Sequence, residues 1–311
     1  MSQNNKIENK ANNKEHNFIS AVVYTQNDNP QTIDFLQQLY GVLDEHFLQY
    51  EIVVVNANGA KSTNVRLKDW AANMDKPLTV VNMSLHQPHE QCMNAGLDIT
   101  IGDYVYEFDS VDMPYEPELI WQAYETAMQG NDVVSVCPER VSGSSRLFYS
   151  LFNNNSNAAY KLRTDAFRLV SRRALNRAHA MNENLPYRKA TYAACGLKMA
   201  ELEFAGKQAA KTSNRLDLAM DSLILYTNFG YKFSLGLALL MLFGTIFMLG
   251  YTAFIYIVGN PVNGWTTTML ALTAGLTGLF AIMTIMLKYM TLILKLIFQK
   301  QSYLIEGIEK L

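Results

Sequence analysis

Two carboxylates follow an apolar segment in the middle of the chain. In "YVYEFDSVDMPYEPELI", residues 104–120, Asp109 ends a run that is typical of a β-strand, and Asp112 stands just before an expected helix. Carboxylate oxygens suit a hard divalent cation such as Mg²⁺ or Mn²⁺, which can offset the charge of a bound phosphate group. The turn is therefore a candidate metal site. In the alternative interpretation, Asp112 is only a negative charge near a helix N-terminus.

Polar side chains also follow two other apolar runs. Thr25 and Asn27 lie in "YTQNDN", and Asn56 and Asn58 lie in "NANG". Asparagine keeps a carbonyl acceptor that can receive an N–H group from a ligand, although it carries no charge. The alternative is that "NANG" is simply a turn, because Asn and Gly tolerate positive φ.

Three arginines, Arg168, Arg172 and Arg173, stand close together in "FRLVSRRAL". Arginine binds phosphate oxygens in a bidentate fashion, so the group is a candidate phosphate site. The other interpretation is a solvated face with surface ion pairs. His86 and His89 in "HQPHEQC" lack a third ligand nearby, which disfavours a zinc site.

Bulk properties exclude several classes of protein. The 311 residues carry a formal net charge of −2 and no dense basic run, so we expect no nucleic-acid partner. Cys92, Cys137 and Cys195 share no metal-ligand or disulfide spacing and are expected to be reduced, buried thiols.

Strands and helices alternate through the first two thirds of the chain. Strands are expected at 18–25, 50–59, 78–84, 103–109 and 132–139, and helices at 30–47, 67–74, 90–100 and 116–130. Repeated βα units predict an α/β fold with a mostly parallel sheet covered by helices on both faces. Ligands of such sheets bind at the carboxyl ends of the strands, where "YTQNDN", "NANG" and "DSVD" would cluster.

The chain is expected to divide into five parts. These are a disordered tail, a cytoplasmic α/β domain, a juxtamembrane amphipathic helix, two transmembrane helices and a cytoplasmic C-terminal tail, at 1–17, 18–215, 216–232, 233–298 and 299–311. The link "GNPVNG" between the two apolar runs is uncharged, whereas lysines flank their other ends. The positive-inside rule then predicts a multi-pass protein of the inner membrane with the α/β domain and both termini in the cytoplasm.

Order and spacing of five segments resemble the family-2 inverting glycosyltransferases with a GT-A fold, especially dolichyl-phosphate mannose synthase and bacterial polyprenyl-phosphate glycosyltransferases. They are "AVVYTQNDNPQTIDFLQQL", "YEIVVVNANGAKST", "NAGLDITIGDYVYEFDSVDMPYEPELI", "FRLVSRRAL" and the hairpin that ends in "SYLIEGI". The resemblance covers nearly everything after Phe18, and it implies a GT-A, Rossmann-like domain followed by a membrane hairpin.

The resemblance also implies roles for individual residues. Metal ligands would be Asp109 and Asp112, spaced by three rather than by two as in a D-x-D turn. Catalytic residues would be Asp109, Asp165 and Arg168, and the acceptor phosphate would contact Arg168, Arg172 and Arg173. Nucleotide-sugar contacts would be Thr25, Asn27, Asn56, Asn58, Asn94 and Asp109.

Two positions depart from the family pattern. "VNANG" stands where the family has V-D-D-G-S, and Leu162 occupies the place of an aspartate five residues before the Phe of F-R-L. A sugar hydroxyl would need a base there, whereas a lipid phosphate is already anionic near neutral pH.

The resulting hypothesis is a glycosyltransferase that uses Mg²⁺ or Mn²⁺ to move a sugar from a nucleotide-sugar to a polyprenyl phosphate. The alternative is a non-catalytic glycosyltransferase-like partner of an active enzyme. A homo-oligomer or a second glycosyltransferase stays open as the protein partner. A processive polysaccharide synthase is disfavoured, since only two spans and no Q-x-x-R-W stretch are present.

Overall fold

A computed structural model describes residues 14–26, 28–57, 61–72, 74, 76–84, 87–156, 159–181, 187–207, 229–259, 264–298 and 303–311. The chain forms two compact units. The first comprises Met1–Leu218 together with Gln299–Leu311, and the second comprises Ala219–Phe298. Most of the expected tail and most of the expected juxtamembrane helix lie outside the described residues.

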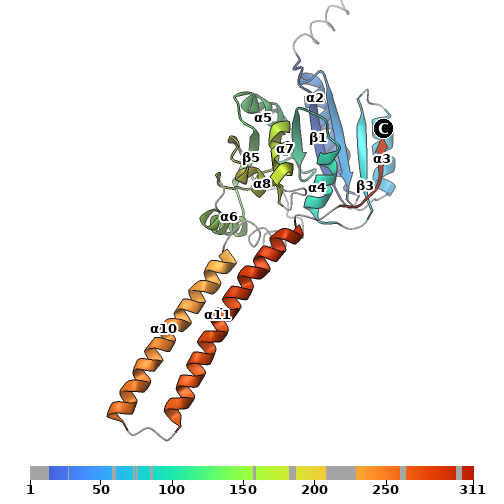
Figure 1. Cartoon of the computed structure of the whole chain (residues 1–311). Coiled ribbons are helices and arrows are strands. Elements are labelled where there is room, and N and C mark those ends of the chain that lie inside the picture. The colour runs from blue at the N-terminus through green and yellow to red at the C-terminus, as the bar shows by residue number, and fades with distance from the viewer. Residues whose placement is uncertain are drawn as a thin grey trace, which may run out of the picture. The chain divides into compact units, whose positions relative to one another are not determined.

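The first unit alternates strands with helices, as the apolar periodicity predicts (Figure 1). Its strands are β1 (Ile19–Thr25), β2 (Tyr50–Asn56), β3 (Leu78–Met83), β4 (Tyr104–Phe108), β5 (Val133–Arg140), β6 (Phe167–Ser171), β7 (Met199–Lys207) and β8 (Ile305–Lys310). Its helices are α2 (Gln31–His46), α3 (Lys61–Ala71), α4 (His89–Asp98), α5 (Glu118–Met128), α6 (Gly143–Asn155), α7 (Arg172–Met181) and α8 (Arg188–Ala194).

The eight strands form one sheet in the order β7-β5-β6-β4-β1-β2-β3-β8. Strands β1 to β4 pair in parallel with one another, and β7 pairs in parallel with β5. Strand β6, inserted between β4 and β5, is antiparallel to both, and β8 is antiparallel to β3. The prediction of a mostly parallel sheet is therefore confirmed.

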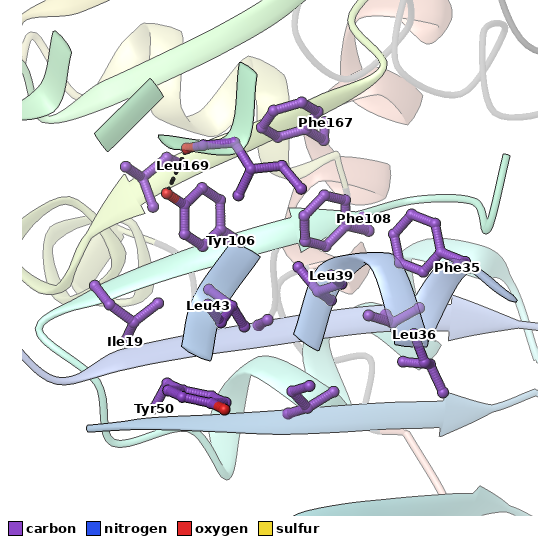
Figure 2. Packing of buried hydrophobic residues seen from close by; sticks show 14 of the residues in the cluster. Ile19, Phe35, Leu36, Leu39, Leu43, Tyr50, Tyr106, Phe108, Phe167 and Leu169 are labelled. Atoms are coloured by element: carbon purple, nitrogen blue, oxygen red, sulfur yellow. Dashed lines mark hydrogen bonds between the residues drawn. The ribbon is translucent and has the colours of Figure 1, made fainter. Parts of the chain in front are cut away.

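Two hydrophobic cores lie on opposite faces of the sheet. One joins the strands to apolar side chains of α2, α3 and α5, and Figure 2 shows part of it around Leu39, Tyr106 and Phe108. The other joins the strands to α4, α7 and α8. Helix α4 approaches the sheet closely at Gly96, where a Cβ atom would lie 2.5 Å from the Val55 side chain. Glycine is needed at this position for close packing.

The two strands that connect the sheet to the second unit, β7 and β8, both have their connecting ends at the carboxyl ends of the parallel strands, which we call the carboxyl edge of the sheet. Strand β7 ends at Lys207, opposite Arg140 at the carboxyl end of β5. Strand β8 begins at Ile305, opposite Met83 at the carboxyl end of β3. The chain therefore leaves and re-enters the sheet at the carboxyl edge. The segment expected as a tail, 299–311, contributes an edge strand.

The second unit consists of two long apolar helices, α10 (Phe229–Val258) and α11 (Trp265–Phe298). Within them, Lys232–Val258 and Trp265–Met290 each have a mean hydropathy of 2.1 and are long enough to cross a membrane. The hydroxyl groups of Thr245 and Thr277 form a hydrogen bond between the two helices, and the hydroxyl oxygens of Ser234 and Thr284 are 3.3 Å apart. Helix α11 continues beyond the second of these segments to Phe298.

Candidate functional site

Asp109 directly follows β4 at the carboxyl edge of the sheet. Strand β1 is its neighbour, and Thr25 at the end of β1 pairs with Asn56 at the end of β2. Arg168 pairs with Glu107 across β6 and β4, so the antiparallel β6 brings its first residues to the same edge. Thr25, Asn56, Asp109 and Arg168 are therefore gathered by the strand register.

Asp109 belongs to a closed ring of ion pairs. Arg168 donates from Nη2 to Asp109 Oδ2 at 2.7 Å and from Nη1 to Glu107 Oε2 at 2.8 Å. Arg188 donates from Nη2 to Asp109 Oδ1 at 2.5 Å and from Nη1 to the same Glu107 oxygen at 2.6 Å. Residues 107 and 109 project to one face because side chains alternate along a strand. Each oxygen of Asp109 is thus held by one guanidinium group.

Further charged groups complete the ring's surroundings. Nε of Arg168 donates to Asp165 Oδ2 at 3.0 Å, and Nε of Arg188 donates to Glu90 Oε2 at 2.7 Å. Lys189 Nζ lies 2.8 Å from Asp165 Oδ1, and it also donates to the carbonyl oxygen of Arg163. Tyr192 donates its hydroxyl to Glu107 Oε1 at 2.5 Å. These contacts connect β4, β6, α4 and α8.

This charged cluster is defined here as Glu90, Glu107, Asp109, Asp165, Arg168, Arg188 and Lys189. Four carboxylates face three cations, so the cluster has one net negative charge. Its side chains are at most 7% exposed, except that of Asp109, which is 28% exposed. The surplus negative charge can therefore meet a ligand only at Asp109.

Burial and ion pairing oppose each other in the cluster. Burial raises the pKa of the Asp109 carboxyl, but the guanidinium groups of Arg168 and Arg188 outweigh it and hold that pKa well below its usual range. Burial likewise raises the pKa of Asp165, and Arg168 and Lys189 bring it below the usual value. The Asp165 carboxylate in turn raises the pKa of Lys189 against the effect of burial. All of these groups are therefore charged near neutral pH.

His89, the first residue of α4, lies beside the cluster. Its Nε2 atom is 3.1 Å from the carbonyl oxygen of Asp109 and 3.9 Å from Oδ1, and its ring packs edge-on against Tyr24. No group of three His, Cys, Asp or Glu side chains that could hold a metal occurs among the described residues. His86, the other histidine considered for a zinc site, lies outside the described residues.

Asp112 lies apart from the ring of ion pairs. Its Oδ2 accepts a 2.9 Å hydrogen bond from the hydroxyl of Ser110, and its backbone N–H donates to the same hydroxyl oxygen. Asp109 keeps a second lone pair on each carboxylate oxygen. Mg²⁺ and Mn²⁺ are often held by one or two carboxylates plus substrate phosphates. A shared site of this kind would need only Asp109 and Asp112 from the protein, and a bound diphosphate would supply further oxygen ligands.

The nucleotide-side predictions are partly located. Thr25 is buried, and its hydroxyl lies 2.8 Å from that of Thr32. Asn56 is buried as well and donates from Nδ2 to Asn64 and Asn82 at 3.0 and 3.1 Å. Asn94 is buried in α4. Asn27 and Asn58 lie outside the described residues.

The acceptor-side arginines are not brought together. Arg168 is buried among three carboxylates at the carboxyl edge. Arg172 and Arg173 begin α7 beyond the far end of β6, level with the amino end of β4. Arg172 donates to the Gly102 carbonyl, and Arg173 pairs with Asp132. One phosphate therefore cannot contact all three, because a whole strand separates them.

Leu162 and Asp165, the residues at and near the place of the family aspartate, both have partners inside the domain. Leu162 is buried, and its backbone N–H and carbonyl both bond the Asn153 side chain at 2.8 and 2.9 Å. Asp165 is paired with Arg168 and Lys189. Neither position offers an unpaired carboxylate as a general base.

Sequence reasoning missed most of the cluster. Glu107 was available as a signal, since a carboxylate inside the apolar run "YVYEFD" must find a buried partner. Arg188 gave no such signal, because the dipeptide "RK" in "NLPYRKATY" is typical of an exposed helix. Only the fold places α8 against the end of β4.

Comparison with known proteins identifies the family. The model of Glycosyl transferase family 2 matches residues 20–194. An uncharacterized glycosyltransferase of Synechocystis sp. is 22% identical over 271 residues, which cover 82% of this chain and 84% of the relative. An undecaprenyl-phosphate 4-deoxy-4-formamido-L-arabinose transferase of Aeromonas hydrophila is 26% identical over 123 residues, which cover 40% of this chain but only 37% of the relative.

A solved structure supports the fold. The mannosyltransferase PcManGT from Pyrobaculum calidifontis, in complex with GDP-Man and Mn²⁺, matches with a TM-score of 0.52 at 17% identity. The match covers 92% of this chain and 89% of the mannosyltransferase. At this identity the likeness concerns the fold alone.

Proposed function

Because the chain belongs to Glycosyl transferase family 2, we propose that it is a membrane-anchored glycosyltransferase that moves a sugar from a nucleotide-sugar to a polyprenyl phosphate. One observation carries this proposal: both connections to the apolar helices join the sheet at the edge that carries Asp109. An acceptor confined to a bilayer is met far more often by a site that is tethered to the same bilayer. The names of two relatives, which specify undecaprenyl-phosphate transferases, support a lipid acceptor.

Connectivity and charge support the proposed orientation. Strands β7 and β8 belong to one sheet, so a hairpin between them that spans a membrane must return to the side on which it began. Lys232 precedes the first apolar run, and Lys288, Lys295 and Lys300 follow the core of the second. These lysines support a cytoplasmic location for the sheet domain in the inner membrane.

A divalent cation, Mg²⁺ or Mn²⁺, fits the net charge of the cluster. Asp109 and Asp112 would hold it, and the nucleotide diphosphate would supply further oxygen ligands. The bound cation would offset the negative charge that develops on the leaving diphosphate. The cluster itself keeps Asp109 ionised and fixed in direction.

The acceptor phosphate needs cations other than the predicted arginines, since Arg168 already donates to three carboxylates. Arg140 ends β5 at the carboxyl edge, and Arg146 lies in α6, which follows β5. Both are exposed, and neither forms an ion pair within the described part of the chain. We therefore assign the phosphate contact to Arg140 and Arg146. The phosphate oxygen is anionic near neutral pH and can attack the anomeric carbon without a base.

A non-catalytic role is the second candidate. It is favoured by Leu162, which fills the place of a family aspartate with a core side chain. A chain of this kind would keep the fold and assist an active glycosyltransferase. Binding of nucleotide-sugar separates the two candidates less well than turnover does.

The direct test is a transfer assay with the full chain in lipid nanodiscs. Polyprenyl phosphate, Mn²⁺ and a panel of nucleotide-sugars are supplied, and both glycolipid and released nucleotide are measured. We expect transfer from one donor and none from the Asp109→Asn variant. Absence of transfer with every donor, together with co-purification of an active glycosyltransferase, would establish the non-catalytic role instead.

A further inference from the structure

We infer that Arg188 is a positioning residue that fixes the direction of the Asp109 carboxylate toward the cation and diphosphate. This inference rests on the proposed function. Arg188 is fully buried. Its guanidinium nitrogens form ion pairs with carboxylate oxygens of Glu90, Glu107 and Asp109, at 2.7, 2.6 and 2.5 Å. A substrate cannot reach Arg188 directly, and of the three carboxylates that it contacts only Asp109 is more than 7% exposed, so Asp109 is the contact through which Arg188 can act on a ligand.

The ring geometry explains why one arginine is insufficient. A carboxylate held at one oxygen can still rotate about its Cβ–Cγ bond. Arg168 fixes Oδ2 from β6 and Arg188 fixes Oδ1 from α8, while both guanidinium groups share Glu107 Oε2. Asp109 is therefore held from two sides by residues on different elements. Its side chain is 28% exposed, which leaves room for a ligand to reach it.

Stability alone does not account for such a ring. Buried ion pairs pay a large desolvation cost, and well-packed apolar side chains at the same positions are often as stable. The ring does provide a fixed, ionised carboxylate at the one exposed position of the cluster. Groups that orient a metal ligand are worth about 10- to 100-fold in metal affinity.

Glu90 provides a way to disturb Arg188 without touching Asp109. Its Oε2 accepts from both Nε and the backbone N–H of Arg188, at 2.7 and 3.2 Å. The variant Glu90→Gln keeps the shape and one acceptor oxygen but removes the charge. It should loosen Arg188 while leaving the contacts of Asp109 with Arg168 in place.

The test measures binding of Mn²⁺ with UDP, and of Mn²⁺ with GDP, by calorimetry on the full chain in detergent. Arg188→Lys keeps the charge but lacks the planar fork, and we expect affinity to fall about 10- to 100-fold. Glu90→Gln should give a smaller loss of affinity, together with a lower thermal midpoint because a buried ion pair loses its carboxylate, so binding is measured well below that midpoint. Arg173→Lys is the matched control, because Arg173 pairs with Asp132 at the opposite edge of the sheet. Unchanged affinity in Arg188→Lys would overturn the inference.

A second measurement separates this inference from the proposed function. Experimental structures of the wild type and of Arg188→Lys show the direction of the Asp109 carboxylate directly. If the wild type binds neither nucleotide, the proposed donor site fails, and a rotated carboxylate in Arg188→Lys still supports positioning. A carboxylate that stays in place in the variant would refute positioning whether or not nucleotide binds.

Discussion

Replacement of Arg168 by methionine tests whether the cluster is part of the folded core or an open ligand site. The Arg168 side chain is 4% exposed and donates to three carboxylates at 2.7–3.0 Å. In Arg168→Met, the net charge of the buried cluster becomes more negative by one, and three carboxylates each lose a donor. Removal of one partner from a buried ion pair costs about 3–5 kcal/mol. For a domain of this size, that loss lowers the thermal midpoint by about 6–20 °C.

The assay is thermal unfolding of the full chain in detergent, followed by intrinsic fluorescence. Arg173→Met serves as the control, because Arg173 pairs with Asp132 at 2.5 Å but its side chain is 71% exposed. Solvent reaches the Arg173 guanidinium, and the buried Asp132 keeps its hydrogen bond from the Ser171 hydroxyl, so we expect a smaller shift of the midpoint than in Arg168→Met. If Arg168→Met shifts the midpoint by less than about 3 °C, burial would not govern this cluster. Arg168 would then be available as a phosphate ligand, as the sequence suggests.

Four further predictions concern packing, thiols and the acceptor. Gly96→Ala should lower the free energy of unfolding, because a Cβ would lie 2.5 Å from a valine side chain of β2. Gly41→Ala in α2 has free space around the Cβ and should raise the free energy of unfolding by about 0.5–1 kcal/mol. Urea denaturation measures both variants. Burial raises the pKa of the Cys92 thiol to about 12, so a thiol reagent at pH 8 should modify it only after unfolding, and rapid modification of the folded chain would contradict its burial. Arg140→Ala should lower kcat/KM for polyprenyl phosphate by about 30-fold, the equivalent of a charge-assisted hydrogen bond of ~2 kcal/mol, and an unchanged value would remove Arg140 from the acceptor site. Asp165→Asn should lower the thermal midpoint, since two cations lose a carboxylate, yet keep most of the transfer to phosphate; complete loss of transfer in a folded variant would indicate a hydroxyl acceptor.

The parallel part of the fold could be predicted from the sequence because its signals are local. Apolar runs such as "YEIVVVN" and "LTVVNM" have strand length, and the helices between them show helical spacing. The insertion of β6 between β4 and β5 and the addition of β8 to β3 could not be predicted. Periodicity identifies a strand but carries no information about its partner. The segment 305–310, "IEGIEK", lacks a strict alternation of polar and apolar residues, because Ile305 and Ile308 lie on opposite faces of the strand, and its partner is more than 200 residues away in the sequence.

Three members of the charged cluster, Asp109, Asp165 and Arg168, are singled out from the sequence, and the other four are not. Asp109 is visible because it ends a strand within a recognisable turn. The groups that control Asp109 come from three other elements, and Glu90 and Arg188 carry no local mark of their burial. The three arginines of "FRLVSRRAL" are close in the sequence but not in the fold. Arg168 lies near the start of strand β6 and Arg172 directly follows its end, so the length of the strand separates them.

The altered acceptor motif constrains the substrate more than it argues against activity. Leu162 is committed to the core, and Asp165 is committed to Arg168 and Lys189, so this loop offers no free base. An enzyme that glycosylates a hydroxyl group would be severely impaired by this arrangement, because the proton of the nucleophile must be removed. A phosphate acceptor presents an oxygen that is already ionised, since its second pKa is about 6. The residues that depart from the family pattern on the acceptor side are therefore those that the proposed lipid-phosphate acceptor does not require.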